Sequence, residues 1–230
     1  MAFFGVTFVL SVMATVARAV APRRVLDVAM LWARILVAAV RVICGIRLEV
    51  SGLENIPPGA ALIASRHQSA FDTFVWLTLV PRCCYVFKDE LLRIPLFGPL
   101  VAAAGMIAVD RSAGAGAIRT LLRGADRAVL EQRQIVIFPE GTRSEPGTLG
   151  PLQSGVAALA ARTGLPVIPV STDSGRFWGR RAFRKRPGTI RILIGRPIPA
   201  HTERKILMQA LEEGMTAIDH VSRPAWVVAV

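Results

Sequence analysis

Cysteine is scarce in this chain of 230 residues, which contains only Cys44, Cys83 and Cys84. An odd number does not suit a disulfide framework, and the adjacent pair is poorly placed for an ordinary disulfide. The spacing also matches no metal-ligand pattern, and the histidines add no convincing cluster, so we expect no metal site. Reduced thiols in a cytoplasmic compartment are the simplest interpretation.

Acidic residues are few as well, with 16 Asp and Glu against 28 Lys and Arg and a formal net charge of +12. This imbalance favours anionic partners, namely phospholipid headgroups, phosphorylated metabolites or nucleic acid. The sequence lacks a Walker loop, a dinucleotide fingerprint and internal repeats. Apolar residues are abundant instead, at 53% with a mean hydropathy of +0.48, which predicts an association with membranes.

The first 45 residues are predicted to form two membrane-embedded or interfacial helices joined near Pro22. Residues 1–17 carry no charged side chain, but such a run is barely long enough to span a bilayer. Arginines follow this run rather than precede it, which disfavours a cleaved signal peptide.

The second apolar segment, residues 25–46, contains Asp27, Arg34 and Arg41 at intervals of seven residues. On a helix this spacing places the three charged side chains on one stripe. Such a helix can lie at the membrane interface with its arginines among the headgroups. The alternative is a helical hairpin packed on a soluble core.

Residues 46–230 are predicted to form a single α/β domain with a mixed, largely buried sheet flanked by helices. Helices are expected over residues 115–132, 152–163 and 203–219, the first with Ile118, Leu122, Ala125 and Val129 on one face and the last with Leu207, Leu211 and Ile218 aligned. The expected strands are the apolar runs IRLEVSG, AALIA, CCYVF, GMIAV, QIVIF, PVIPV and TIRILI.

The stretch SRHQSAFDT, residues 65–73, places His67 and Asp72 five positions apart. In a continuous helix these side chains would be roughly 140° apart around the axis, so a turn must intervene if they are to meet. Ser69 followed three residues later by Asp72 resembles a capping box for the next helix. A catalytic pair and a simple helix cap therefore both remain possible interpretations.

The stretch FPEGTRS, residues 138–144, follows a predicted buried strand, where ligands bind in open α/β sheets. Gly141 allows the backbone to approach a ligand, and Arg143 can bind two phosphate oxygens. Glu140 can accept a hydrogen bond from an alcohol or an arginine. An ordinary turn is the competing explanation.

Three further stretches carry weaker signals. Arg111, at the end of GMIAVDR, either supplies a second phosphate contact or forms a surface ion pair. Residues 88–100 are predicted as a loop that contacts an acyl chain or bilayer, or merely covers the core. Residues 174–188 interleave arginines with aromatic residues, which suits an anionic membrane surface or single-stranded nucleic acid. The apolar amino-terminal segments favour the membrane, so no nucleic acid is expected.

Four motifs in order, HQSAFD, GMIAVDR, FPEGTRS and PVIPV, make residues 46–200 resemble the 1-acyl-sn-glycerol-3-phosphate acyltransferases. The resemblance implies that His67 and Asp72 are the catalytic pair. It also implies a glycerol-phosphate site composed of Arg111, Glu140, Gly141, Thr142 and Arg143. The chain departs from the family pattern at Arg66, where many members have Asn, and at Gln153, where many have Lys.

This resemblance implies acyl transfer from acyl-CoA or acyl carrier protein to the sn-2 hydroxyl of 1-acyl-sn-glycerol-3-phosphate, at the cytoplasmic face of the inner membrane. His67 would act as general base and Asp72 would orient it, without metal or cofactor beyond the thioester co-substrate. An acyl-enzyme on Ser69 is a less economical route, because a thioester is already activated. Two alternatives are a different acceptor, such as lyso-ornithine lipid, and a non-catalytic basic protein that binds membrane or nucleic acid.

Overall fold

The computed structural model describes residues 12, 14–16, 18–21, 24–95, 97–180, 182–220 and 228–229. Strands and helices alternate along most of the chain, which confirms the predicted α/β class. The strands are β1 (Ile46–Ser51), β2 (Ala61–Ser65), β3 (Cys83–Lys88), β4 (Ile107–Val109), β5 (Gln134–Ile137), β6 (Val167–Thr172), β7 (Gly188–Ile194) and β8 (Val228–Ala229). The helices are α2 (Val25–Cys44), α3 (Asp72–Leu79), α4 (Phe97–Ala103), α5 (Ala115–Leu130), α6 (Gly155–Thr163) and α7 (Arg204–His220).

The strands form one mixed sheet in the order β4-β3-β5-β2-β6-β7-β1-β8. Strands β4, β3, β5, β2 and β6 are parallel neighbours, whereas β7 runs antiparallel to β6 and β8 antiparallel to β1. The mixed sheet is therefore confirmed. Because β2, β4 and β5 are parallel, the loops that follow them emerge at the same edge of the sheet.

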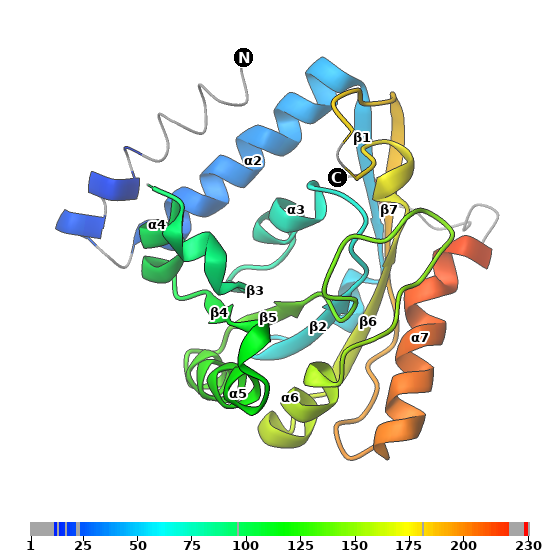
Figure 1. Ribbon diagram of the computed structural model, residues 1–230. Coiled ribbons are helices and arrows are strands. Elements are labelled where there is room, and N and C mark those ends of the chain that lie inside the picture. Colours follow the sequence, from blue (N-terminus) through cyan, green and yellow to red (C-terminus); the bar gives the residue numbers. More distant parts are fainter. Residues whose placement is uncertain are drawn as a thin grey trace.

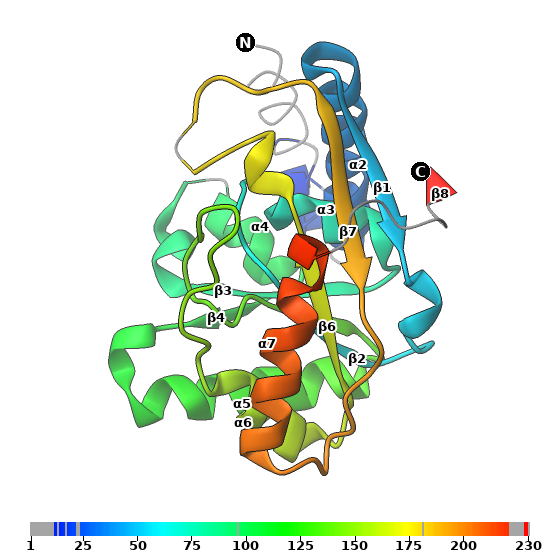
Figure 2. The same ribbon diagram turned by 90° about the vertical axis from the view of Figure 1, so that its right-hand side faces the viewer.

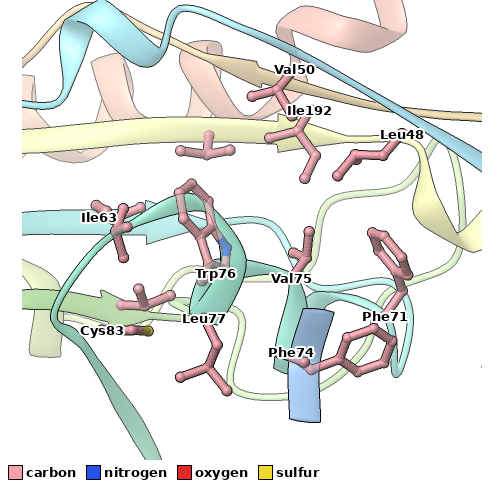
Figure 3. Close-up of a cluster of buried hydrophobic side chains, with 14 of the residues drawn as sticks. Leu48, Val50, Ile63, Phe71, Phe74, Val75, Trp76, Leu77, Cys83 and Ile192 are labelled. Atoms are coloured by element: carbon pink, nitrogen blue, oxygen red, sulfur yellow. The ribbon is translucent and has the colours of Figure 1, made fainter. Parts of the chain in front are cut away.

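Helices cover both faces of this sheet (Figures 1 and 2). In β2, Ala61 and Ile63 face a core shared with α2 and α3, and Leu62 and Ala64 face a core shared with α5, α6 and α7. Figure 3 shows Trp76 of α3 directed toward the sheet beside Ile63. Strands buried on both faces explain the continuous apolar runs in the sequence.

Helix α2 packs one face against the core, where Ala33, Leu36 and Val40 are buried. The charged stripe of Asp27, Arg34 and Arg41 is exposed on the opposite side, in agreement with the seven-residue spacing. Within the described part of the chain, no helix has the length and apolarity to cross a bilayer. Pro22 and most of the first predicted helix lie outside the described residues.

Two details of the helical prediction were wrong. The stretch 88–100, predicted as a loop, contains a 3-10 helix (Asp89–Arg93) and the beginning of α4. Its glycine and proline suggested a loop, but Pro is tolerated in the first turn of a helix. In α5 the most buried residues are Ala117, Leu121, Ala125 and Ala128, so the buried face is rotated from the predicted one. Three of these four residues are alanines, whose small side chains are buried in the core on that side of the sheet.

Candidate active site

His67 and Asp72 lie on either side of the turn between β2 and α3. The Nδ1 atom of His67 is 3.2 Å from Oδ2 of Asp72. The same oxygen accepts hydrogen bonds from the backbone N–H groups of Gln68 and Ser69, each at 2.7 Å. Asp72 therefore accepts hydrogen bonds from the backbone of the turn that precedes α3 and also contacts the imidazole. The second bond of the expected capping box does not form, because Ser69 Oγ accepts from the N–H of Phe71 instead of the N–H of Asp72.

The ring of His67 is held in place from several sides. It stacks on Phe138 with 4.3 Å between ring centroids and an interplanar angle of 21°. Its backbone N–H donates to Glu140 Oε1 at 2.8 Å, and its carbonyl accepts from the N–H of Ser144 at 2.8 Å. A carboxylate beside Nδ1 favours the tautomer with its proton on that atom, which leaves Nε2 as a proton acceptor.

Glu140 is buried and its carboxylate has backbone partners. Besides the N–H of His67, it accepts a hydrogen bond from the N–H of Gly150 at 3.4 Å. The sequence suggested an alcohol or an arginine as its partner. In the structure this carboxylate instead joins the loop after β5 to the loop after β2.

Arg111 reaches from the end of β4 to the loop after β5, where its Nη1 donates a hydrogen bond to the carbonyl of Gly141. Gly141 has φ of +70°, and a Cβ there would lie 2.9 Å from Nη1 of Arg111. Partial burial lowers the pKa of Arg111 below its ordinary value, and nearby Glu90 opposes this shift. The guanidinium remains charged at neutral pH, because its ordinary pKa is very high.

A cavity of about 470 Å³ opens beside these residues. Its polar part is lined by His67, Arg111, Gly141, Thr142, Arg143 and Arg180. Its apolar part is formed by α2, α3, β3 and α4, including Trp32, Leu77 and Leu100. The cavity therefore brings a proton acceptor and several cations next to an apolar chamber, a combination that suits an amphiphile with an anionic headgroup.

Five of the seven predicted site residues line this cavity: His67, Arg111, Gly141, Thr142 and Arg143. Asp72 and Glu140 lie behind it and support His67. Ser69 is fully buried and its Oγ accepts a hydrogen bond from the N–H of Phe71, consistent with a structural role.

Sequence reasoning missed the contribution of Phe138 and Arg180 to the site. Phe138 was included in the strand QIVIF and in the motif FPEGTRS but was given no role, and Arg180 was counted only as part of a basic surface. The one available signal was the position of Phe138 directly before the PEGTRS turn.

An α/β fold with a histidine–carboxylate pair at an apolar cavity is compatible with an acyltransferase, and the sequence model of the family described as Acyltransferase matches residues 47–173. The chain is 39% identical over 198 residues to the 1-acyl-sn-glycerol-3-phosphate acyltransferase of Pseudomonas aeruginosa, covering 85% of this chain and 73% of that protein. It is 30% identical over 203 residues to the human 1-acyl-sn-glycerol-3-phosphate acyltransferase alpha, covering 86% and 71%.

The crystal structure of the 1-acyl-sn-glycerophosphate (LPA) acyltransferase PlsC from Thermotoga maritima has the same fold, with a TM-score of 0.73. That comparison covers 97% of this chain and 95% of the other at 22% sequence identity. The chain belongs to the 1-acyl-sn-glycerol-3-phosphate acyltransferase family.

Proposed function

We propose that this protein transfers a fatty acyl group from an acyl thioester to the sn-2 hydroxyl of 1-acyl-sn-glycerol-3-phosphate and so forms phosphatidic acid. The observation that carries this proposal is the position of His67. Its Nδ1 is 3.2 Å from Asp72, and its side chain lines the same cavity as Arg111 and Arg143. A base and two guanidinium groups can thus act on one molecule that has both a hydroxyl and a phosphate.

In the proposed reaction, Nε2 of His67 accepts the proton of the acceptor hydroxyl as its oxygen bonds to the thioester carbonyl carbon. Asp72 stabilises the imidazolium that results. When the tetrahedral intermediate collapses, the carbon–sulfur bond breaks and the imidazolium returns its proton to the thiolate. The products are the new ester and a free thiol, on either coenzyme A or acyl carrier protein.

The cations of the cavity have the role of holding the acceptor. Arg143 and Arg111 would bind phosphate oxygens and place the hydroxyl near His67, an orientation effect that can lower a barrier by several kcal/mol. The apolar chamber between α2 and α4 would accommodate a fatty acyl chain. Its lining by Trp32, Leu77 and Leu100 supports this assignment.

Membrane association belongs to the same proposal, because the acceptor is an amphiphile. We place the protein on the cytoplasmic face of the membrane. Apolar side chains near the cavity are exposed, including Leu91, Ile94 and Phe97 at 37%, 45% and 39%. Phe183 is 96% exposed, and the ammonium of Lys185 lies 4.6 Å from the ring centre of Trp178. Aromatic and cationic side chains together favour the headgroup region of an anionic bilayer.

The test is an assay of the purified protein with acyl-CoA or acyl carrier protein as donor and three acceptors: lysophosphatidic acid, lysophosphatidylcholine and lyso-ornithine lipid. We expect thioester-dependent formation of phosphatidic acid. Arg143→Ala should raise the KM for lysophosphatidic acid by roughly 10- to 100-fold, the loss of a charge-assisted contact. Arg162→Ala is the matched control, since Arg162 pairs with Asp126 on the α5/α6 surface. Product from lyso-ornithine lipid alone would contradict the proposed acceptor.

A further inference from the structure

Arg66 directly precedes His67 but is absent from the cavity lining, and its side chain is fully buried. Its Nη1 lies 2.5 Å from Oδ2 of Asp219, near the end of α7. Its Nη2 donates a hydrogen bond to the carbonyl of Thr148 at 2.7 Å. One buried guanidinium therefore contacts both α7 and the loop that follows β5.

That loop, residues 141–150, is attached to the site by several hydrogen bonds, including the one that Gly141 accepts from Arg111. The N–H of Ser144 donates to the carbonyl of His67, and the N–H of Gly150 donates to Glu140. The bond from Arg66 to Thr148 holds the part of the loop between these two contacts. Since Thr142 and Arg143 line the cavity, the position of the loop determines where these side chains lie.

We propose that Arg66 and Asp219 are positioning residues that fix the loop 141–150 for binding of the phosphorylated acceptor, which makes the end of α7 part of the acceptor site. Asp219 lies outside residues 47–173, the region that matches the family model. The identity of the acceptor rests on the function proposed above. The proposed role of Arg66 in holding the loop does not depend on that identity, because it follows from the contacts of Arg66 with Asp219 and Thr148.

The charge of Arg66 and the planar shape of its guanidinium contribute separately to the contacts with Asp219 and Thr148. Asp219 compensates a buried cation, so its removal alone leaves that charge unpaired, which is strongly unfavourable. A lysine would keep the charge, but its compact ammonium cannot reproduce two divergent donors on one planar group. Asp219 is held in place in turn, because the N–H of neighbouring Ile218 donates to Ser171 Oγ on β6 at 3.2 Å.

The experiment compares Arg66→Lys and the double variant Arg66→Met/Asp219→Leu with wild type, with Arg162→Lys as the control at an exposed ion pair. Amide hydrogen exchange reports on the loop without any substrate. In both Arg66 variants we expect exchange at Ser144 and Gly150 to be roughly tenfold faster, the factor for one lost hydrogen bond to a charged group. Exchange in the β2 and β5 strands should be unchanged, and the control should resemble wild type.

The kinetic arm measures the KM for lysophosphatidic acid, the KM for the acyl donor and kcat. Arg66→Lys should raise the KM for lysophosphatidic acid about tenfold, again the factor for one lost hydrogen bond to a charged group. The KM for the acyl donor and kcat should stay within about twofold of the wild-type values. Unchanged exchange at Ser144 and Gly150, or a loss confined to kcat, would overturn the positioning role. A wild-type protein inactive on lysophosphatidic acid would overturn the proposed function instead, and the exchange result would still decide the role of Arg66.

Discussion

At the scale of single residues, Asp72 makes two kinds of contact, one with the backbone of the turn and one with the His67 ring, and one substitution can separate them. Asp72→Asn keeps an oxygen for the N–H groups of Gln68 and Ser69, but an amide does not fix the tautomer of His67 or stabilise its cationic form. We expect kcat to fall by about 10²- to 10⁴-fold, as for His67→Ala, because the proposed mechanism needs both the imidazole and the carboxylate that orients it. The midpoint of thermal unfolding should change little.

Steady-state kinetics together with thermal unfolding of the purified variants checks this expectation. Phe138→Leu is a useful comparison, because it removes the ring that stacks on His67 but keeps the His67–Asp72 contact. It should reduce kcat much less. Activity of Asp72→Asn within twofold of wild type would exclude the proposed mechanism.

The cysteines give a second residue-scale prediction. Burial raises the pKa of Cys84 to about 11 and that of Cys83 well above its ordinary value, whereas Cys44 is only half-buried. Since the thiolate is the reactive form, iodoacetamide at pH 8 should label Cys44 alone in the folded protein. Mass spectrometry should find one adduct in the native protein and three after denaturation. Three adducts on the folded protein would contradict the buried positions.

The raised pKa of Cys84 also affects stability at alkaline pH. The unfolded chain loses the thiol proton near its ordinary pKa of 9.0, and the folded chain only near 11. The contribution of the buried neutral thiol is thus complete below pH 9 and is lost as the pH rises toward 11.

At the scale of elements, the turn after β5 depends on Gly141 in two ways. Its φ of +70° lies in the left-handed region, and a Cβ would come within 2.9 Å of Arg111 Nη1. Gly164, at the end of α6, has φ of +68° but nothing within 4 Å of the corresponding Cβ position. Both substitutions to Ala therefore introduce the same backbone strain, and only one disturbs a guanidinium.

We expect Gly141→Ala and Gly164→Ala to lower the free energy of unfolding by a similar amount, about 1–2 kcal/mol. Gly141→Ala should in addition raise the KM for the phosphorylated acceptor, because Arg111 must move away from its carbonyl partner. Denaturant unfolding and steady-state kinetics of the two variants provide the measurements. An equal effect of both variants on KM would indicate that the contact between Arg111 and Gly141 does not matter for binding.

The elements were largely predictable, because each arises from a local pattern. The predicted strand QIVIF corresponds to β5 (Gln134–Ile137), and the predicted helix over residues 203–219 corresponds to α7 (Arg204–His220), with Leu207, Leu211 and Ile218 buried as expected. Burial of alternating or helically spaced apolar residues leaves such a signature. Helix α4 was missed because its first turn contains Gly98 and Pro99, which usually signal a loop.

At the scale of the whole molecule, the sequence could not reveal contacts between distant segments. The order of the strands was not predictable, because all the parallel strands are similarly apolar. The ion pair between Arg66 and Asp219 joins residues 153 positions apart, and no local pattern marks either partner. The turns that carry His67 and Glu140 were recognised, yet their mutual hydrogen bond depends on β2 and β5 being neighbours.

The net charge of +12 and the exposed apolar side chains lead to a prediction for the entire protein. We expect both the positive charge and the exposed apolar side chains to contribute to membrane binding. Co-sedimentation should then be stronger with vesicles that contain anionic lipid than with neutral vesicles. Salt should weaken the anionic component, since the Debye length falls from about 10 Å at 0.1 M to about 3 Å at 1 M. The remaining binding should resemble that to neutral vesicles.

The basic and aromatic segment is tested by reversing the charges of Arg184 and Lys185 to Glu. Each cation near an anionic surface contributes on the order of 1 kcal/mol, so the double reversal should weaken binding to anionic vesicles at least tenfold. Binding to neutral vesicles should stay the same, and Arg162→Glu should have a smaller effect, because Arg162 lies on the α5/α6 surface. If Arg162→Glu weakened binding to anionic vesicles as much per charge as the double reversal, only the total charge of the protein would determine this binding. A specific effect of the double reversal would place the segment 184–185 at the bilayer. Arg180, which lines the polar part of the cavity, would then lie close to the membrane surface, as the proposed amphiphilic acceptor requires.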